Sequence, residues 1–276
     1  MGQPANIDPK TVEGFGEEWS AFDQFDQDER EHRELFEGYF SPFPFAEVKD
    51  GEGFDLGCGS GRWAVLAAGK VGKLHCIDPS AKALEVARRR LAGIRNVEFH
   101  LAGVDDMPIG DGTQDFGYSL GVLHHIPDTQ AAMDACVRKL KPGAPFLVYL
   151  YYSFDNRSAW YRAMWRTSEL FRFGISRLPF PARRVMTNTL AATVYLPLAR
   201  TARFLERRGV NVESWPLSAY RNRGFYSMKT DALDRFGTRL EQRFSRDEIS
   251  EMMTRAGLRD IVFGDFGHWV ACGRKA

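Results

Sequence analysis

The sequence has few of the features that secreted, membrane-spanning or disulfide-bonded proteins need. Its four cysteines are widely spaced, without a Cys-x-x-Cys pair or a Cys/His cluster, so neither a disulfide framework nor a metal site is predicted. No apolar run approaches the roughly 20 residues of a membrane span. The opening residues, MGQPANIDPK, contain no apolar signal segment. These absences predict a cytoplasmic protein without a bound metal.

Excess charge of one sign is also missing from the chain as a whole, since 37 Lys and Arg face 36 Asp and Glu. The balance is uneven, however, because residues 153–244 hold 17 basic and 7 acidic side chains, and 16 of the basic ones are Arg. A basic segment in an otherwise acidic chain predicts an anionic partner for that segment. With 276 residues, 44% of them apolar, the chain is long enough for one large core and an added segment.

Strands and helices alternate from Gly53 onward, which is typical of βαβ units and predicts a doubly wound, mostly parallel sheet. The alternation stops over 153–244, where long helical stretches are predicted, and it returns with a capped helix and two closing strands over 245–276. A helix over 15–40 is predicted to precede the sheet, after a loosely attached segment at 1–14. Five short apolar strands are predicted before the interruption, at 53–56, 73–78, 96–102, 115–121 and 144–152.

The glycines of GFDLGCGSGRW are typical of a ligand-binding loop. Gly57, Gly59 and Gly61 lie between a strand and a helix, and glycines allow backbone N–H groups to approach a ligand closely. The spacing differs from that of dinucleotide-binding loops, and no Gly-Lys-Ser/Thr follows as in a P-loop. Asp78 ends the next strand, where a carboxylate can accept both hydroxyls of an adenosine ribose. The structural alternatives are a simple turn and an acid favoured at a helix N-terminus.

Four segments, in this order, resemble the successive motifs of class I S-adenosylmethionine-dependent methyltransferases of the type 11 family: FDLGCGSGRW, CIDPS, MPIGDGTQDFGYSLGVLHHIPD and LKPGAPFLVYLYY. The resemblance covers about residues 51–152 and the last 30 residues. It implies an α/β, Rossmann-like fold with a seven-stranded sheet, the last strand antiparallel, flanked by helices and with a helical insertion after the fifth strand. It also implies S-adenosyl-L-methionine as methyl donor and S-adenosyl-L-homocysteine as product.

The resemblance assigns donor-site roles to residues of these motifs. Asp55 would hold the methionine amino group, Asp78 the ribose hydroxyls, and the backbone of Leu120 and Gly121 would line the methionine. The predicted cofactor-binding residues are Trp19, Asp55, Gly57, Cys58, Gly59, Gly61, Asp78, Pro79, Val104, Asp105, Leu120 and Gly121.

The residues expected to bind the adenine of the donor depart from the family pattern. The family often carries an acid two residues after the third strand to bond the adenine amino group, and here Gly103 occupies that position. Asp105 is therefore assigned to the adenine and Val104 to packing on its ring. Trp19 lies in the predicted helix that would fold over the donor as a lid, which would keep water from a reactive sulfonium. Ordinary helix packing is the alternative role for Trp19.

Ligands of such sheets bind outside the carboxyl ends of the strands, so the insertion would begin above the donor. Methyl transfer is an in-line displacement that needs alignment and, for some OH or NH nucleophiles, a base. His125, Tyr152 and His268 are the predicted catalytic residues because topology brings them to this end of the sheet. A structural or donor-side role is the alternative for His125.

The predicted domains are an N-terminal helical lid (15–45), a methyltransferase domain (46–152 and 245–276) and an Arg- and aromatic-rich helical cap (153–244). The cap would shape a pocket for an anionic or bulky acceptor. Arginines bracket an apolar stretch at 181–208, which favours peripheral membrane contact as an addition. An RNA-binding face and a plain helical subdomain with its own aromatic core are the other interpretations.

The sequence therefore predicts an S-adenosylmethionine-dependent methyltransferase that acts on a small-molecule, lipid-linked or glycan-precursor acceptor. Two alternatives stay open. One is a donor-binding protein without turnover. The other is an RNA methyltransferase that uses the basic insertion, which the near absence of Lys in that segment disfavours.

Overall fold

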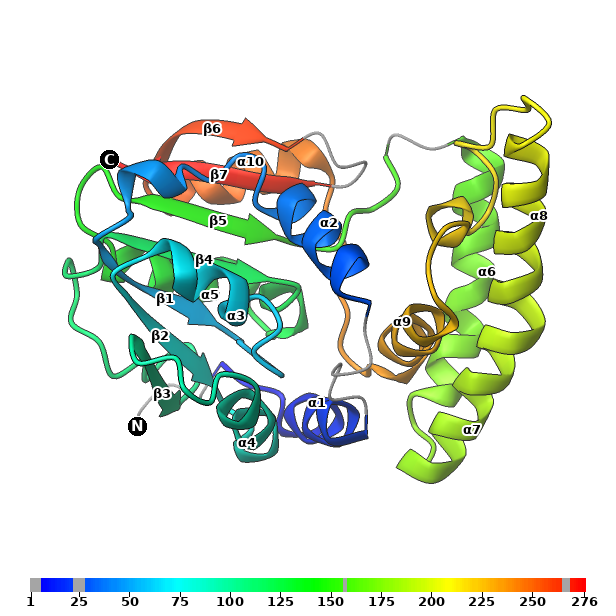
Figure 1. The fold of residues 1–276 in the computed structure, drawn as a ribbon, viewed down its shortest axis with the longest axis horizontal. Coiled ribbons are helices and arrows are strands. Elements are labelled where there is room, and N and C mark those ends of the chain that lie inside the picture. The colour runs from blue at the N-terminus through cyan, green and yellow to red at the C-terminus, as the bar shows by residue number, and fades with distance from the viewer. Residues whose placement is uncertain (1–5, 22–27, 156–157, 265–268) are drawn as a thin grey trace. The chain divides into compact units, whose positions relative to one another are not determined.

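The computed structural model describes residues 6–21, 28–155, 158–264 and 269–276 (Figure 1). They belong to two compact units. The first unit holds the described residues up to 21, those from 33 to 155, and those from 240 onward. The second unit holds residues 28–32 and the described residues from 158 to 239.

A seven-stranded sheet forms the centre of the first unit, in the order β3-β2-β1-β4-β5-β7-β6. Strand β7 pairs antiparallel with both β5 and β6, whereas the other pairs are parallel, so the predicted topology is confirmed. The strands are β1 (Glu52–Leu56), β2 (Lys73–Asp78), β3 (Val97–Leu101), β4 (Phe116–Leu120), β5 (Pro145–Tyr149), β6 (Leu258–Phe263) and β7 (Val270–Lys275).

Helices cover both faces of this sheet, which is why the central strands β1, β2 and β4 are almost entirely buried. One face packs on α5 (Thr129–Lys139) and α10 (Arg246–Arg255). The other face packs on α3 (Ala64–Ala67), α4 (Ala81–Arg90) and the end of α2 (Glu29–Tyr39). Helix α10 begins with the predicted capping box, in which Ser245 and Glu248 bond each other's backbone N–H groups.

The N-terminal region differs from the prediction. The structure contains α1 (Pro9–Ala21) and α2 in place of one helix over 15–40, with residues 22–27 outside the described part. Residues 9–14 are helical, so their prediction as loosely attached was wrong. The Asp8 carboxylate accepts a hydrogen bond from the Thr11 backbone N–H at 2.7 Å. With Pro9 at the first helical position, this is a regular helix start.

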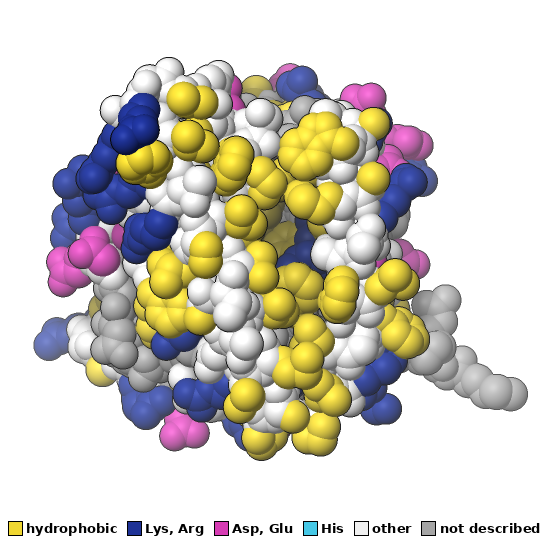
Figure 2. Space-filling view, turned by 90° about the vertical axis from the view of Figure 1, so that its right-hand side faces the viewer, with side chains coloured by type: hydrophobic (Ala, Val, Ile, Leu, Met, Phe, Trp, Pro, Cys, Tyr) yellow, Lys and Arg dark blue, Asp and Glu magenta, His cyan; other side chains and the backbone are white. Residues whose placement is uncertain are grey.

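The second unit is helical, as predicted for the insertion. Helix α6 (Ala159–Ile175) is followed by α7 (Phe180–Leu190), a π-helical turn (Ala191–Tyr195) and α8 (Leu196–Glu206), the last three forming one continuous helix. Helix α9 (Phe225–Gly237) was not predicted. Figure 2 faces α6 to α8 and shows hydrophobic side chains gathered on them. No helix in the described ranges has the length and apolarity of a membrane span.

Candidate functional site

The glycine loop after β1 requires glycine at two positions where φ is positive and a side chain would have little space. Gly57 has a φ of +75°, and a Cβ there would lie 2.4 Å from a methyl carbon of Val122. Gly59 has a φ of +54°, and its Cβ would lie 3.0 Å from the indole nitrogen of Trp19. Side chains would therefore be excluded both by backbone conformation and by space. Trp19 comes from α1, so this helix covers the loop, while Gly61 has a φ of +73° where the chain turns into α3.

Asp78 connects the end of β2 to this loop. One carboxylate oxygen accepts a hydrogen bond from the Gly59 backbone N–H at 2.9 Å, and the other accepts one from the Ser80 N–H at 2.8 Å. Burial raises the pKa of Asp78 to about 6, while the two N–H donors act in the opposite direction. Each oxygen keeps a second lone pair, so Asp78 can still accept hydrogen bonds from a ligand.

Asp55 is a buried acid in β1, immediately before the loop. Within the described residues, its Oδ2 atom has no hydrogen-bond partner. Burial raises the pKa of Asp55 to about 8; the nearby Tyr118 hydroxyl lowers it, and the charge of Asp78 raises it further. An unpartnered buried carboxyl is costly, and such groups are typical of ligand sites. A cationic or N–H donor would satisfy it.

The end of β4 offers an open backbone surface beside these acids. Gly121 has a φ of +78°, and a Cβ there would meet no atom of the residues that the structure describes within 4 Å. Its N–H donates to the carbonyl of Tyr149 at 3.1 Å. The neighbouring Leu120 is buried. This segment therefore presents backbone rather than side chains to the space in front of it.

The remaining predicted donor-site residues lie in different environments. Val104 is buried with the core on one face of the sheet. Asp105 is exposed, and its carboxylate accepts a hydrogen bond from the Asn6 backbone N–H at 2.5 Å. Cys58 is a buried free thiol, and Pro79 is half-buried. The contact with Asn6 had no signal in the sequence, because 99 residues separate the two partners.

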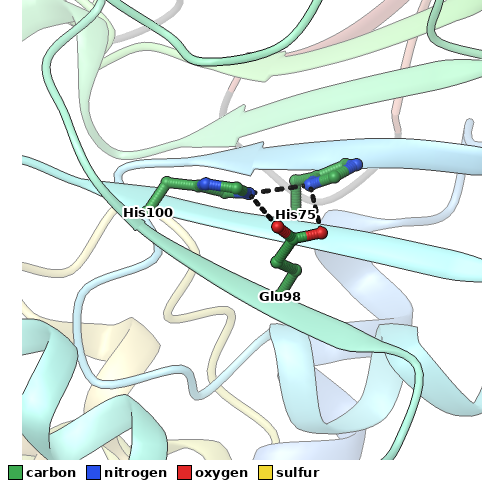
Figure 3. Close-up of side chains that lie close together, drawn as sticks. All are labelled: His75, Glu98 and His100. Atoms are coloured by element: carbon green, nitrogen blue, oxygen red, sulfur yellow. Dashed lines mark hydrogen bonds and ion pairs between the residues drawn. The ribbon is translucent and has the colours of Figure 1, made fainter.

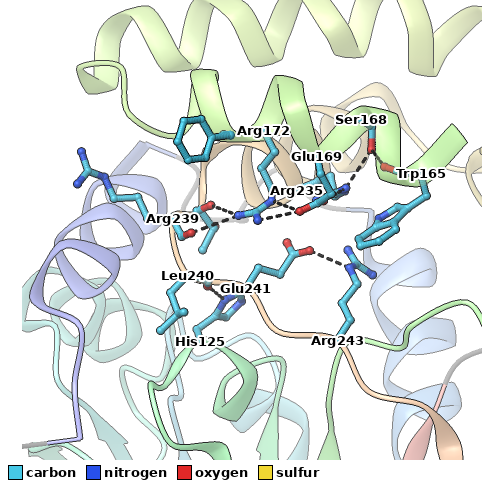
Figure 4. Close-up of polar contacts among 12 residues, drawn as sticks. His125, Trp165, Ser168, Glu169, Arg172, Arg235, Arg239, Leu240, Glu241 and Arg243 are labelled. Atoms are coloured by element: carbon cyan, nitrogen blue, oxygen red, sulfur yellow. Dashed lines mark hydrogen bonds and ion pairs between the residues drawn. The ribbon is translucent and has the colours of Figure 1, made fainter. Parts of the chain in front are cut away.

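Histidines and aromatic rings gather where β4 and β5 end. His125 lies 2.6 Å, through Nδ1, from the carbonyl of Leu240, so Nδ1 carries the proton (Figure 4). His124 is fully buried, and its ring stacks on Tyr151 with centroids 3.9 Å apart. Burial holds the pKa of His124 well below its usual value, so this ring is neutral. In the described part of the chain, neither of its ring nitrogens has a hydrogen-bond partner. Sequence reasoning did not select His124.

The other two predicted catalytic residues differ in what can be said of them. Tyr152 is half-buried; its backbone pairs with Phe244 in a parallel bridge, and its carbonyl accepts a hydrogen bond from the Arg243 guanidinium at 3.2 Å. Arg243 also pairs with Glu241 at 2.8 Å (Figure 4). His268 lies outside the described residues.

Comparison with known protein families identifies the domain that this sheet and loop form. Residues 54–143 match the family model described as a methyltransferase domain, and this span contains the glycine loop, Asp78 and the segment after β4. The chain has a class I S-adenosylmethionine-dependent methyltransferase domain. The methyl donor of this domain is S-adenosylmethionine.

Curated relatives match about a third of the chain. A ubiquinone biosynthesis O-methyltransferase from Thiobacillus denitrificans is 35% identical over 107 residues, which are 38% of this chain and 44% of the relative. A demethylmenaquinone methyltransferase from Staphylococcus aureus is 31% identical over 99 residues, which are 34% of this chain and 41% of the relative. The chain thus spans less than half the length of these relatives.

Solved structures share the fold over nearly the whole chain. A methyltransferase from Thermotoga maritima aligns with 96% of this chain and 100% of its own, at a TM-score of 0.51 and 16% identity. A methyltransferase from Mesorhizobium loti aligns with 86% of this chain and 95% of its own, at a TM-score of 0.50 and 16% identity. These similarities support the fold of the methyltransferase domain.

A second polar cluster lies away from this site, on β2 and β3. His75 and His100 approach to 2.8 Å through ring nitrogens, and Glu98 pairs with both (Figure 3). Three such side chains could hold a metal ion. The Lys73 ammonium, however, lies 3.0 Å from Glu98 and 3.2 Å from Glu52. The ammonium pairs with both carboxylates, so Glu98 belongs to an ion-pair network.

Proposed function

We propose that this protein is an enzyme that transfers the methyl group of S-adenosylmethionine to a small-molecule acceptor. The observation that carries the proposal is the pair of buried acids, Asp55 and Asp78, on either side of a glycine loop with positive φ angles. Each acid keeps hydrogen-bonding capacity, and the donor offers an ammonium group and two ribose hydroxyls. The two acids of the site thus complement the ammonium group and the ribose hydroxyls of the donor.

The donor would bind along the carboxyl ends of β1, β2 and β4. The unpartnered oxygen of Asp55 fits the methionine ammonium, since a buried carboxylate is stabilised by an adjacent positive charge. Asp78 would accept the ribose hydroxyls through the lone pairs that the Gly59 and Ser80 N–H groups leave available. The backbone at Gly121 would pass beside the methionine, because no atom of the described residues lies within 4 Å of where its Cβ would be.

Trp19 and the end of the chain near Asn6 would cover the donor. Trp19 already lies against the glycine loop, and Asn6 bonds both the Asp105 carboxylate and the backbone of Asp128. A cover of this kind excludes water, which both protects a sulfonium from hydrolysis and strengthens electrostatic interactions in the site. Asn6 bonds only one carboxylate oxygen of Asp105, so the other oxygen could still accept a hydrogen bond from the adenine amino group.

His125 is the best-placed base among the predicted catalytic residues. Because its Nδ1–H donates to the Leu240 carbonyl, the neutral ring keeps its lone pair on Nε2. A lone pair held in one tautomer is what proton abstraction from an acceptor OH or NH requires. The neighbouring His124 is neutral, so it would not oppose the positive charge that His125 gains.

The acceptor would be a flat or apolar ring compound, either free or linked to a lipid. A row of aromatic rings supports this, in which Tyr39 contacts Trp63 and Tyr149, and Tyr149 contacts Tyr151, with centroids 5.1 to 5.7 Å apart. The two named relatives act in ubiquinone biosynthesis and on demethylmenaquinone, which agrees with a ring acceptor. Contact of residues 181–208 with a membrane would bring the enzyme to a lipid-linked acceptor.

Calorimetric titration with S-adenosylhomocysteine tests donor binding, and transfer of radiolabelled methyl to aromatic acceptors tests turnover. Asp78→Ala is expected to weaken binding by about 2 kcal/mol, or roughly 30-fold, because ribose hydroxyls lose a charged acceptor. Asp111→Ala is the control, since Asp111 is an exposed acid on the surface. Unchanged binding in Asp78→Ala would refute the donor site. Tight donor binding without transfer to any acceptor would identify a donor-binding protein and refute the proposed enzymatic activity.

A further inference from the structure

Large apolar side chains of the second unit lie at its surface rather than in its core. Among the described residues, 13 large apolar side chains are exposed, and 11 of them fall between residues 160 and 225. Leu170 of α6 is the most exposed of these, at 75%, and its neighbour Phe171 is 63% exposed. Single exposed apolar residues are common on proteins, but so many in one segment mark an interaction site.

Most exposed apolar residues of α6 share one helical face, with Phe173 as the exception. Trp160, Met164 and Phe171 recur at helical spacing with Leu170 beside them, and the exposed Thr167 on the same face is uncharged. Glu169 and Arg172 of α6 face the other way, whereas Arg162 and Arg166 are exposed. Glu169 pairs there with Arg172 at 2.8 Å and with Arg235, as Figure 4 shows.

The continuous helix from α7 to α8 likewise has a row of uncharged residues on its exposed side. Ala182, Val185, Met186, Thr189 and Thr193 recur at helical spacing and are all exposed. Its inner side carries small residues, among them Ala191 and Ala199, which pack on α9 in the core of the unit. In Figure 2 hydrophobic side chains run along these helices, while Lys and Arg lie toward the margins.

The charge of the same helices is strongly positive. Residues 158–210 contain ten Arg and two Glu, without any Lys or Asp. Both glutamates are paired, since Glu169 bonds Arg172 and Arg235, and Glu206 lies 2.9 Å from Arg221. Both acids of these helices are therefore already neutralised, so neither offsets the charge of the remaining arginines at the exposed surface.

We propose that α6 and the α7–α8 helix form a membrane-binding face that docks on an anionic lipid surface. An apolar helical face flanked by basic residues lies in the plane of a bilayer, with the apolar side chains among the acyl chains and the cations at the headgroups. Anionic lipids supply the charge that complements the arginines. The face belongs to the second unit alone, so the proposal does not depend on donor binding or on methyl transfer.

The test uses the full chain and vesicles of phosphatidylcholine with and without phosphatidylglycerol. Co-sedimentation of the wild type is expected only with the anionic vesicles. Leu170→Ser/Phe171→Ser is expected to lower the partition coefficient at least tenfold, because two exposed apolar side chains no longer enter the bilayer. Val262→Ser is the matched control, since Val262 is an exposed apolar residue of the first unit.

The electrostatic part has its own variants. Arg162→Gln/Arg166→Gln is expected to weaken anionic-vesicle binding by about fivefold for each arginine near the surface. Arg255→Gln, an exposed position on α10, is the control. Brominated lipid is expected to quench the fluorescence of Trp160, measured as the difference from Trp160→Phe. S-adenosylhomocysteine affinity should be unchanged in every variant, which separates this proposal from the donor site.

Three results would overturn the proposal. Wild-type protein that stays in the supernatant with anionic vesicles would do so directly. A solution dimer that Leu170→Ser/Phe171→Ser converts to monomer would assign the face to a second copy of the chain. Binding to a single-stranded RNA probe that requires the arginines but not Leu170 or Phe171, without vesicle binding, would assign it to nucleic acid.

Discussion

The proton on Asp55 offers a direct measure of donor binding. Burial raises the pKa of this carboxyl to about 8 in the free protein, so it is mostly protonated at neutral pH. A ligand ammonium beside it would favour the ionised form and drive the proton off. Donor binding near pH 7 is therefore expected to release about one proton per site.

The size of the effect follows from this shift. Below the pKa of the free protein, the affinity for S-adenosylhomocysteine is expected to rise about tenfold per pH unit, since each unit corresponds to about 1.4 kcal/mol. The pKa of Asp78 is raised only to about 6. The window from about pH 6.5 to about pH 7.5 therefore reports on Asp55 more than on Asp78.

Calorimetry in two buffers of different ionisation enthalpy counts the released protons. Asp55→Asn keeps the shape of the side chain and removes its proton, so this variant is expected to bind weakly and with a flat pH profile. Absence of proton release by the wild type near neutral pH, or the same pH slope in Asp55→Asn, would refute the assigned role.

The same shift has a consequence for stability in the free protein. The pKa of Asp55 in the folded chain lies above its ordinary value of 3.8, so folding favours the protonated form. The carboxyl therefore lowers the free energy of unfolding progressively as the pH rises from about 4 to about 8. Asp55→Asn is expected to stabilise the free protein at pH 8 by on the order of 1 to 3 kcal/mol. A loss of stability there would contradict this sign.

Three further predictions concern the loop, the covering helix and the ion-pair network. Gly57→Ala is expected to lower the free energy of unfolding by about 1 to 3 kcal/mol more than Gly143→Ala, because both glycines have positive φ but only the Cβ at Gly57 meets a neighbour; equal losses in denaturant unfolding would exclude the clash. Trp19→Ala is expected to weaken S-adenosylhomocysteine binding about tenfold in calorimetry, through lost aromatic contact, and unchanged affinity would reduce Trp19 to helix packing. Lys73→Gln is expected to cost less than about 1 kcal/mol in denaturant unfolding, because its ion pairs are half-exposed; a much larger cost would mean that the network is buried.

The sheet could be predicted because its strands have sequence patterns that can be recognised locally. Strands buried on both faces have continuous apolar sequences, and glycine or Asp-Pro turns separate them from amphipathic helices. The chain order of the motifs then determines which loops lie at the carboxyl ends. This reasoning brings Asp55, Asp78 and Gly121 to one end of the sheet, and the structure places them there.

The remaining features depend on contacts between distant parts of the chain. The bond from Asn6 to Asp105, and the complete burial of His124, follow from tertiary packing that no local pattern encodes. The second unit also differs from an ordinary amphipathic segment. Its core contains aromatic residues such as Tyr195 beside small ones such as Ala191, while Phe171 is exposed. A helical apolar stripe has the same sequence pattern whether it faces a core or a membrane.

The way the chain leaves and re-enters the first unit has a consequence for how such proteins diversify. The backbone of Phe244 bonds that of Tyr151 and Ser153 at 2.8 and 2.9 Å, so the chain before and after the insertion is held side by side at these residues. Closing a loop between fixed ends costs only about 0.6 kcal/mol more for each doubling of its length. The first unit therefore tolerates insertions, deletions or whole replacements of the segment at little cost in loop-closure entropy. A short Gly-Ser linker in place of 156–239 should leave a first unit that folds and still binds S-adenosylhomocysteine.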